Sequence, residues 1–154
     1  MIERLTSTNL ADITTLGKAF AAEADYPGGF EFSAFRALWS PLIDHGIGEI
    51  LVMRDDSGEI QGAIGASYIS DPFSGRPTAA EQFWYVMLEH RRSPLGVTLF
   101  EAFEDEAKSR GVEKIIMIHL EKLTPERLRV FLEKRGYAAV EQTFWKVLGT
   151  KGEV

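Results

Sequence analysis

The sequence predicts an α/β (α+β) domain with about seven strands and four helices in the order β-α-α-β-β-β-α-β-α-β-β. Three stretches predict this class. Residues 83–111 show a short aromatic and β-branched strand that leads through a turn into an amphipathic helix. Residues 49–70 hold two apolar runs on either side of Asp-Asp-Ser-Gly, which is typical of a β-hairpin. Residues 114–136 repeat the strand-then-helix pattern.

Before the hairpin, the pattern predicts one strand and two helices. Residues 2–5 form a short strand, and apolar residues at helical spacing indicate a helix over 10–24. The segment 26–30, with one proline and two glycines, breaks that pattern. A second helix begins at about Ser33, and Pro41 is expected to kink or divide it.

The second strand of the hairpin contains two glycines. Gly62 and Gly65 predict a bulge or the close approach of another backbone, because glycine has no side chain to pack in a strand. A loop over 71–77 follows and exposes Phe73. The central strand of the fold then runs over 78–88.

The turn after the central strand has the residues of a helix start. Ser93 suits the N-cap and Pro94 the first helical position, because proline lacks the N–H that would be unpaired there. The first amides of the helix lie at its positive end, which is a site for phosphate, and Gly96 is expected to leave room for a diphosphate. The same residues also fit a helix start without a ligand, since Ser93 can satisfy one of the amides.

The last part of the chain predicts a strand, a helix and two more strands. A buried strand runs over 114–120. Thr124 and Pro125 open the helix, and Gly136 ends it. The two closing strands are expected over 137–140 and 143–148.

The composition describes one folded domain and excludes several kinds of site. With 154 residues, 45% of them hydrophobic, we expect a single domain over 1–148 and a frayed tail at 149–154. The chain has no cysteine, which excludes disulfides, thiolate metal sites and a cysteine nucleophile. Its three histidines show no metal-ligand spacing, so no metal is expected.

The charge and hydropathy patterns bear on partners and compartment. The net charge of −6 disfavours nucleic acid, whose binders usually show a basic face. No apolar stretch approaches the roughly 18 residues of a membrane span, and the N-terminus has no basic-then-apolar signal. We therefore expect a cytoplasmic protein with neither nucleic-acid nor membrane partners. The sequence leaves open whether it forms a homodimer.

The order of elements and two motifs resemble the GNAT acetyltransferase superfamily over residues 1–148. That family carries Arg/Gln-x-x-Gly-x-Gly/Ala between its central strand and helix. Residues 91–96 (RRSPLG) match the outer positions, with Pro94 in place of the first glycine. Residues 131–137 (FLEKRGY) resemble the family's Phe-Tyr-Glu-Lys-x-Gly-Phe, with Leu132 in place of the tyrosine. The resemblance implies a mixed, mostly antiparallel sheet.

The resemblance also implies a reaction. Family members use acetyl-CoA as co-substrate and transfer its acetyl group directly to a primary amine, here of a small molecule or a protein of unknown identity. Amides of the turn hold the pyrophosphate, and the central strand pairs with pantetheine. The residues implied for binding acetyl-CoA are Val86, Met87, Leu88, Arg91, Arg92, Ser93, Leu95, Gly96 and Val97.

Two proton transfers need side chains. The amine must lose a proton before it attacks, and family members place a carboxylate on the central strand for this task. Glu81 matches that carboxylate, although it also fits a solvated strand start. Because Leu132 removes the family's tyrosine acid, Tyr85 and His119 are the nearest substitutes, and a lone histidine at a strand end is more often structural. A catalytically inactive GNAT-fold module that binds acyl-CoA or a protein is the alternative function.

Segments near the ends of the central strand are expected to select the acceptor, because loops carry binding roles readily. The aromatic candidates are Tyr26, Phe30 and Phe73, and the acidic candidates for attracting an amine are Glu23, Asp25, Glu31 and Asp71. Nothing in these residues identifies the amine.

Overall fold

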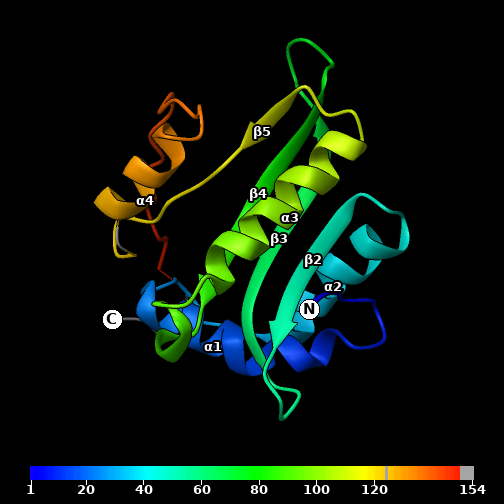
Figure 1. Cartoon of the computed structure of the whole chain (residues 1–154), viewed down its shortest axis with the longest axis vertical. Coiled ribbons are helices and arrows are strands. Elements are labelled where there is room, and N and C mark those ends of the chain that lie inside the picture. The colour runs from blue at the N-terminus through cyan, green and yellow to red at the C-terminus, as the bar shows by residue number, and fades with distance from the viewer. Residues whose placement is uncertain (124, 150–154) are drawn as a thin grey trace. The chain divides into compact units, whose positions relative to one another are not determined.

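The computed structural model describes residues 1–123 and 125–149. Its packing divides the chain into two compact units, Met1–Ile118 and a second unit from His119 onward, and each is described by itself (Figure 1). The predicted cap Thr124 and all but the first residue of the predicted tail lie outside the described residues. Among the residues that are described, no helix is both long and apolar enough to cross a lipid bilayer.

The first unit is built on one sheet of five strands in the order β1-β2-β3-β4-β5. The strands are β1 (Ile2–Arg4), β2 (Gly48–Arg54), β3 (Ile60–Ser70), β4 (Pro77–Val86) and β5 (Lys114–Ile116). Neighbouring strands are antiparallel except β4 and β5, which are parallel. The predicted mixed, mostly antiparallel sheet is therefore confirmed, with five strands rather than about seven in the described part of the chain.

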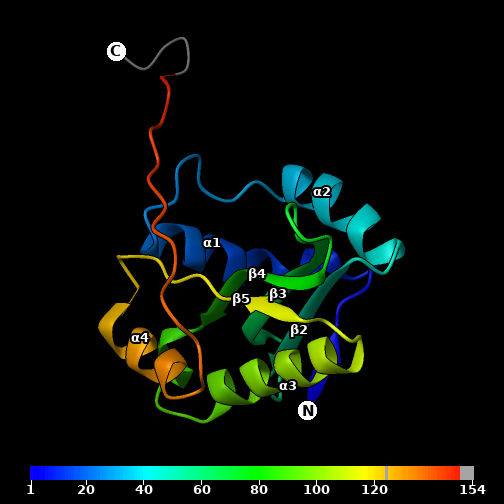
Figure 2. The same cartoon turned by 90° about the horizontal axis from the view of Figure 1, so that it is seen from above.

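Helices cover both faces of this sheet. They are α1 (Thr14–Glu23), which follows the 3-10 turn η1 (Leu10–Ile13), α2 (Phe32–Asp44), and α3 (Leu95–Ser109), which follows the 3-10 turn η2 (Leu88–His90). Figure 2 shows α3 on one face of the sheet and α1 and α2 on the other. Pro41 does not divide α2. It lies in the last turn, where a missing N–H and a steric clash affect only the end of the helix.

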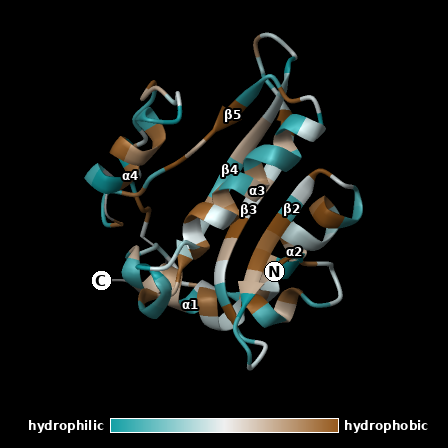
Figure 3. Cartoon of the chain, viewed as in Figure 1, coloured by the Kyte–Doolittle hydropathy of each residue, from teal (hydrophilic) through white to brown (hydrophobic). Residues whose placement is uncertain are grey.

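The apolar stripe of α3 packs onto the sheet. Leu99, Phe103 and Ala107 are each at most 1% exposed and pack against a core layer from three strands. That layer consists of Leu51 on β2, Ile64 and Ala66 on β3, and Ala79 on β4. Full burial of a leucine or phenylalanine contributes roughly 1.5–3 kcal/mol, so these contacts hold α3 in place. Figure 3 shows the hydrophilic outer side of α3 and the apolar strands behind it.

The opposite face of the sheet is aromatic. Phe83 on β4 packs against Phe35 and Trp39 of α2, with ring centroids 6.2 and 5.7 Å apart. Gly65 on β3 makes room for this ring, because a Cβ at Gly65 would lie 2.3 Å from it. The close approach predicted at Gly65 therefore involves a side chain rather than another backbone.

The predicted bulge lies in β3 itself, beside Gly62. Met53 pairs with Gly62 and Arg54 with Ile60, so Gln61 is the extra residue there. A second bulge lies on β4 opposite the other glycine: Gly65 pairs with Phe83 and Ala66 with Glu81, so Gln82 is the extra residue. Such a bulge changes the direction of the side chains that precede it, here that of Glu81.

The second unit contains α4 (Pro125–Glu133), followed by residues 137–149 with neither helix nor strand. The predicted strands over 137–140 and 143–148 are therefore wrong. Val140 and Phe144 are 83% and 82% exposed. Strand propensity does not suffice, because a strand forms only where a partner completes its backbone hydrogen bonds, and the described structure gives these residues no ladder.

The C-terminal ends of the helices confirm the two glycines predicted there and show a third residue with positive φ. Gly111 after α3 and Gly136 after α4 have φ of 72° and 88°, a left-handed conformation that glycine adopts at no steric cost. Helix α1 ends at Glu23, and two residues later Asp25 has φ of 53° and donates its N–H to Ala22 O at 3.3 Å. The break predicted over 26–30 therefore begins one residue earlier.

Candidate active site

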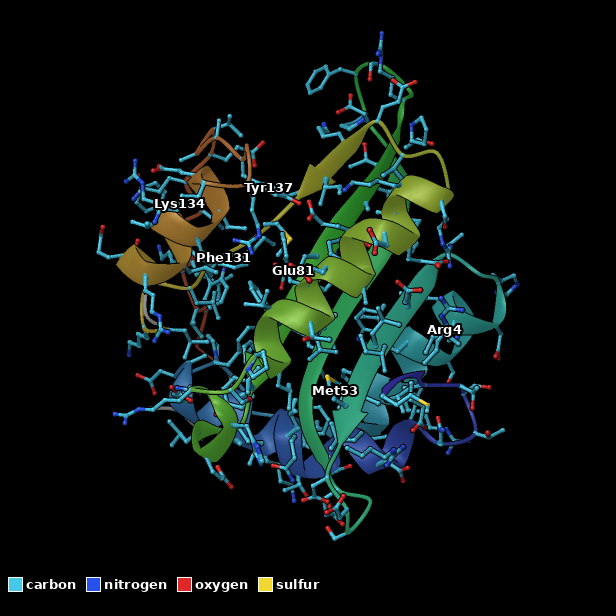
Figure 4. The ribbon with its side chains drawn as sticks, in the orientation of Figure 1. Arg4, Met53, Glu81, Phe131, Lys134 and Tyr137 are labelled. Carbon is cyan, nitrogen blue, oxygen red and sulfur yellow. The ribbon has the colours of Figure 1, made fainter. Side chains whose placement is uncertain are left out.

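The sheet opens where β5 leaves β4. The two strands pair over 78–80 and 114–116, and β5 ends there rather than at the predicted Leu120. Glu81 is the next residue of β4, and its Oε2 accepts the N–H of Ile118 at 2.8 Å. The side chain thus replaces a backbone acceptor that a longer ladder would supply. Figure 4 labels Glu81 among the side chains of this region.

Burial changes the protonation of Glu81. The residue is only 2% exposed, so it is not the solvated strand start that the sequence left open. Burial raises the pKa of its carboxyl to about 8, and the N–H of Ile118 opposes this shift to a smaller extent. Above that pH, Glu81 is a stronger base than an ordinary carboxylate. A pKa near the working pH suits a general base.

The end of β4 presents backbone groups to the opening. Met87 donates its N–H to Gln61 O of β3 at 2.8 Å. Successive residues of a strand point their backbone groups to opposite edges, so Val86 directs its N–H and C=O to the edge that β5 leaves. The backbone of Val86 therefore lies at the edge of β4 where the predicted pairing with a ligand would take place. Leu88, by contrast, is 67% exposed in the turn that follows.

The start of α3 leaves amides available. The first N–H groups of a helix have no acceptor within the helix. Ser93 Oγ accepts the N–H of Leu95 at 3.3 Å, which is the satisfied amide that the sequence allowed for. Pro94 rather than Ser93 is the N-cap, because the helix begins at Leu95. The amides of Gly96 and Val97 remain at the positive end of the helix.

The missing side chain of Gly96 faces the sheet. A Cβ there would lie 3.3 Å from Val86 Cγ2 and 3.9 Å from Trp84 Cζ2. The glycine therefore lets α3 approach β4 closely, and the expectation that it leaves room for a diphosphate does not match this geometry. Its backbone N–H is unaffected by this difference.

Replacing Gly96 with alanine should leave the affinity for CoA within roughly threefold of the wild type, which is about 0.6 kcal/mol. Stability should change by less than about 1 kcal/mol, because the better helix propensity of alanine offsets the tight contact with Val86. Calorimetric titration and urea unfolding measure the two quantities. A tenfold loss of CoA affinity in a stable variant would show instead that this position faces the ligand.

Two of the predicted residues form an ion-pair network. Nη1 of Arg91 donates to Oε1 of Glu23 at 2.6 Å, and its Nη2 pairs with Oε2. The hydroxyl of Tyr85 donates to the same Oε2 at 2.6 Å. Burial raises the pKa of Tyr85 to about 12. A hydroxyl that is bonded to a carboxylate and has so high a pKa is a poor acid for a thiolate, so this geometry disfavours Tyr85 as the general acid.

The structure does not bring the predicted catalytic residues Glu81 and Tyr85 to one point. Glu81 and Tyr85 are four residues apart on β4, which is roughly 13 Å along a strand. His119 is exposed and begins the second unit, and its role stays a prediction. Arg92, predicted for the cofactor, is exposed in the turn. Within the described residues, no group of His, Cys, Asp and Glu could hold a metal ion.

Part of the predicted acceptor region is a shallow hollow of about 310 Å³ beside α1. Its lining consists of Lys18, Ala21, Ala22, Asp25, Tyr26, Gly29 and Phe30. Tyr26, Phe30 and Asp25 thus line one hollow, and their role in acceptor binding stays a prediction. Phe73 is not part of the hollow and lies 99% exposed in the loop between β3 and β4.

The other acidic candidates differ in availability. Asp71 pairs with Lys114 and accepts two amides of its own loop, which holds its pKa well below the usual range. Glu23 is bonded to Arg91, as described above. Glu31 is exposed at the start of α2. Of these three carboxylates, only that of Glu31 is left without a role in a described ion pair.

A second buried carboxylate was missed by the sequence reasoning. Glu49 on β2 is 1% exposed and accepts Nε of Arg4 at 3.1 Å and the hydroxyl of Tyr68 at 3.0 Å. The guanidinium of Arg110, on the turn after α3, lies 3.9 Å above the Tyr68 ring. The only signal in the sequence was a glutamate at the head of an apolar run, and such a residue is usually exposed. Its partners tie β1, β2, β3 and the end of α3 together.

Comparisons with solved structures show the same fold in several acetyltransferases. A ribosomal-protein-alanine N-acetyltransferase from Brucella melitensis biovar Abortus 2308 is 20% identical, with a TM-score of 0.72 over 97% of this chain and 99% of that chain. An aminoglycoside acetyltransferase from an uncultured soil metagenomic sample is 17% identical, with a TM-score of 0.75 over 97% and 96%. An acetyltransferase from Trypanosoma brucei is 19% identical, with a TM-score of 0.72 over 96% and 99%.

Sequence comparison agrees with this likeness. No curated protein matches the chain. A model of the acetyltransferase (GNAT) family matches residues 19–137, which run from the middle of α1 to the residue after Gly136 and include both motifs. That match covers well over half of the chain. The chain therefore belongs to the acetyltransferase (GNAT) family, whose members are acyltransferases.

Proposed function

We propose that this chain is an acetyl-CoA-dependent N-acetyltransferase that transfers the acetyl group directly to a primary amine of a small molecule or a protein. The observation that carries the proposal is the buried carboxylate of Glu81 at the point where β4 and β5 part. The outward-facing backbone of Val86 and the amides at the start of α3 follow along the chain. Family membership supports acetyl-CoA as the donor that these groups hold.

In this proposal the chain holds an anionic donor and accepts one proton. The amides of Gly96 and Val97 bind the diphosphate, and the backbone of Val86 pairs with the pantetheine arm. The amine nitrogen attacks the thioester carbon, a C–N bond forms, and the C–S bond breaks to release the thiolate. Glu81 takes the proton of the amine, directly or through water. The thiolate leaves without a dedicated acid, since its thiol has a pKa of only about 8.5.

Two observations favour a second candidate function, in which the domain binds acyl-CoA or a protein without turnover. Pro94 replaces the first glycine of the family motif and supplies no N–H to the turn. Leu132 stands where the family carries its tyrosine acid, and it is only 8% exposed. The first difference removes one amide from the turn that would hold the diphosphate, and the second removes the family's acid for the leaving thiolate. This candidate predicts binding without transfer.

Two measurements test the proposal. Free thiol released from acetyl-CoA is followed with a panel of amines that includes an aminoglycoside and a peptide with an N-terminal alanine, because similar structures are named for those acceptors. Separately, CoA at a hundredfold excess over its dissociation constant should stabilise the fold by about 2.7 kcal/mol. Amine-dependent thiol release supports the enzyme, and stabilisation without release supports the second candidate. Absence of both effects contradicts the enzyme and an acyl-CoA-binding module, and leaves only a module that binds a protein.

A further inference from the structure

A bidentate ion pair joins the turn before α3 to the end of α1. Arg91 lies in that turn, and two of its nitrogens bond both carboxylate oxygens of Glu23. The two side chains are only 28% and 29% exposed, so water screens this pair less than an ordinary surface pair. Paired N–H groups from one guanidinium also fix the relative orientation of the two side chains.

The third contact of Arg91 is made with the end of β4. Its Nε donates to Val86 O at 3.0 Å, and this carbonyl belongs to the edge that β5 leaves. The guanidinium lies 5.1 Å from the centre of the Tyr85 ring, whose hydroxyl bonds the same carboxylate of Glu23. Phe20 packs its edge against that ring, with centroids 5.6 Å apart. Arg91 is thus held by groups from two distant parts of the chain.

These contacts leave Arg91 with capacity for a ligand. A guanidinium has five N–H groups, and three of them are used on Val86 and Glu23. A carbonyl oxygen accepts two hydrogen bonds, so the Val86 contact does not exclude a donor on that edge. The contacts of Arg91 therefore order the turn and still leave hydrogen-bonding groups for a ligand.

We propose that Glu23 is a positioning residue for the acyl donor, which acts by holding Arg91 and, through it, the turn between β4 and α3. The inference rests on the proposed function and extends it to a residue of α1 outside both family motifs. Loss of the carboxylate removes two of the three hydrogen bonds of Arg91 and loosens the turn, and the donor must then order both when it binds. Glu23 makes no contact with the reacting atoms in this arrangement.

The Glu23→Gln variant tests this role. It should raise KM for acetyl-CoA roughly tenfold, which corresponds to about 1.4 kcal/mol, and change kcat and KM for the amine much less. A merely structural role would lower the folded fraction, and hence the apparent kcat, without changing KM. Glu3→Gln is the matched control, because Glu3 forms the same bidentate pair with Arg54 at another place in the first unit.

A second measurement covers the case in which turnover is low. Calorimetric titration of folded protein with CoA should show the same roughly tenfold loss for Glu23→Gln. Arg91→Gln should also weaken binding, and the double variant should lose less than the sum of the two, because both changes break one pair. Equal or tighter CoA binding by Glu23→Gln would overturn the inference alone. A wild type that binds no CoA would overturn the proposed function together with it.

Discussion

Replacing Glu81 with glutamine should lower the rate of acetyl transfer by roughly 10²-fold and should at the same time stabilise the fold at neutral pH. The rate falls because the amide accepts no proton from the attacking amine. Glutamine has nearly the same shape, and its oxygen can still accept the N–H of Ile118. The opposite signs of the two effects follow from the burial of a carboxyl group.

The sign of the stability effect comes from the raised pKa. An unfolded glutamate has a pKa of about 4.3, whereas burial raises the pKa of Glu81 to about 8 in the fold. The folded state therefore favours the protonated form, and the wild type loses stability as the pH rises from about 4.3 to about 8. Glutamine has no such loss. At pH 7 the free energy of unfolding of the variant should be higher than that of the wild type by on the order of 3 kcal/mol.

Urea unfolding at pH 5 and at pH 8 measures this difference, and a pH–rate profile measures the catalytic part. The stability advantage of Glu81→Gln should be small at pH 5 and large at pH 8. The wild-type rate should rise through about pH 8 as Glu81 loses its proton. The variant should keep only the rise that comes from deprotonation of the amine itself. An unchanged rate would remove Glu81 from the mechanism, and an equal advantage at both pH values would contradict its raised pKa.

Replacing Glu49 with alanine should lower the free energy of unfolding by about 2–4 kcal/mol. Glu49 accepts hydrogen bonds from Arg4 and Tyr68 at 1% exposure. The truncation leaves the hydroxyl of half-buried Tyr68 without this acceptor and opens a space between β2 and the end of α3. It also removes the negative charge that Arg4 and Arg110 share.

Glu49→Gln is the control for this prediction. It keeps the volume and one acceptor oxygen, so it should destabilise less than the alanine variant. Urea unfolding compares the two, and KM for acetyl-CoA should be unchanged in both, because Glu49 lies two strands away from β4. If Glu49→Ala has the same free energy of unfolding as the wild type, the contacts of Glu49 make no net contribution to stability, as is common for exposed ion pairs.

The elements of the first unit could be predicted because they depend on short-range patterns. The apolar spacing of α3, the turn residues of the hairpin and Gly111 after the helix each act over a few residues. The same local patterns wrongly predict two strands after α4. Aromatic and β-branched residues favour a strand locally, but the ladder that makes one requires a partner elsewhere in the fold.

Sequence patterns indicate candidate site residues, but not the surroundings that set their chemistry. Glu81 was placed on the central strand by its position, while its burial depends on the bulge at Gln82 and on the N–H of Ile118. Arg91 was assigned to the cofactor by a motif, yet its partner Glu23 lies 68 residues earlier in the chain. No local pattern carries information about such a pair.

The sequence by itself determined the order of the elements from β1 to α4, the C-terminal ends of α3 and α4, and the turn that leaves free amides at the start of α3. These features follow from side-chain spacing, from proline without an N–H and from glycine with positive φ. Only the tertiary structure decided the raised pKa of Glu81, the ion pair of Arg91 and the buried contacts of Glu49. A pKa and an ion pair depend on the solvent and charges around a group, and folding brings these from distant parts of the chain.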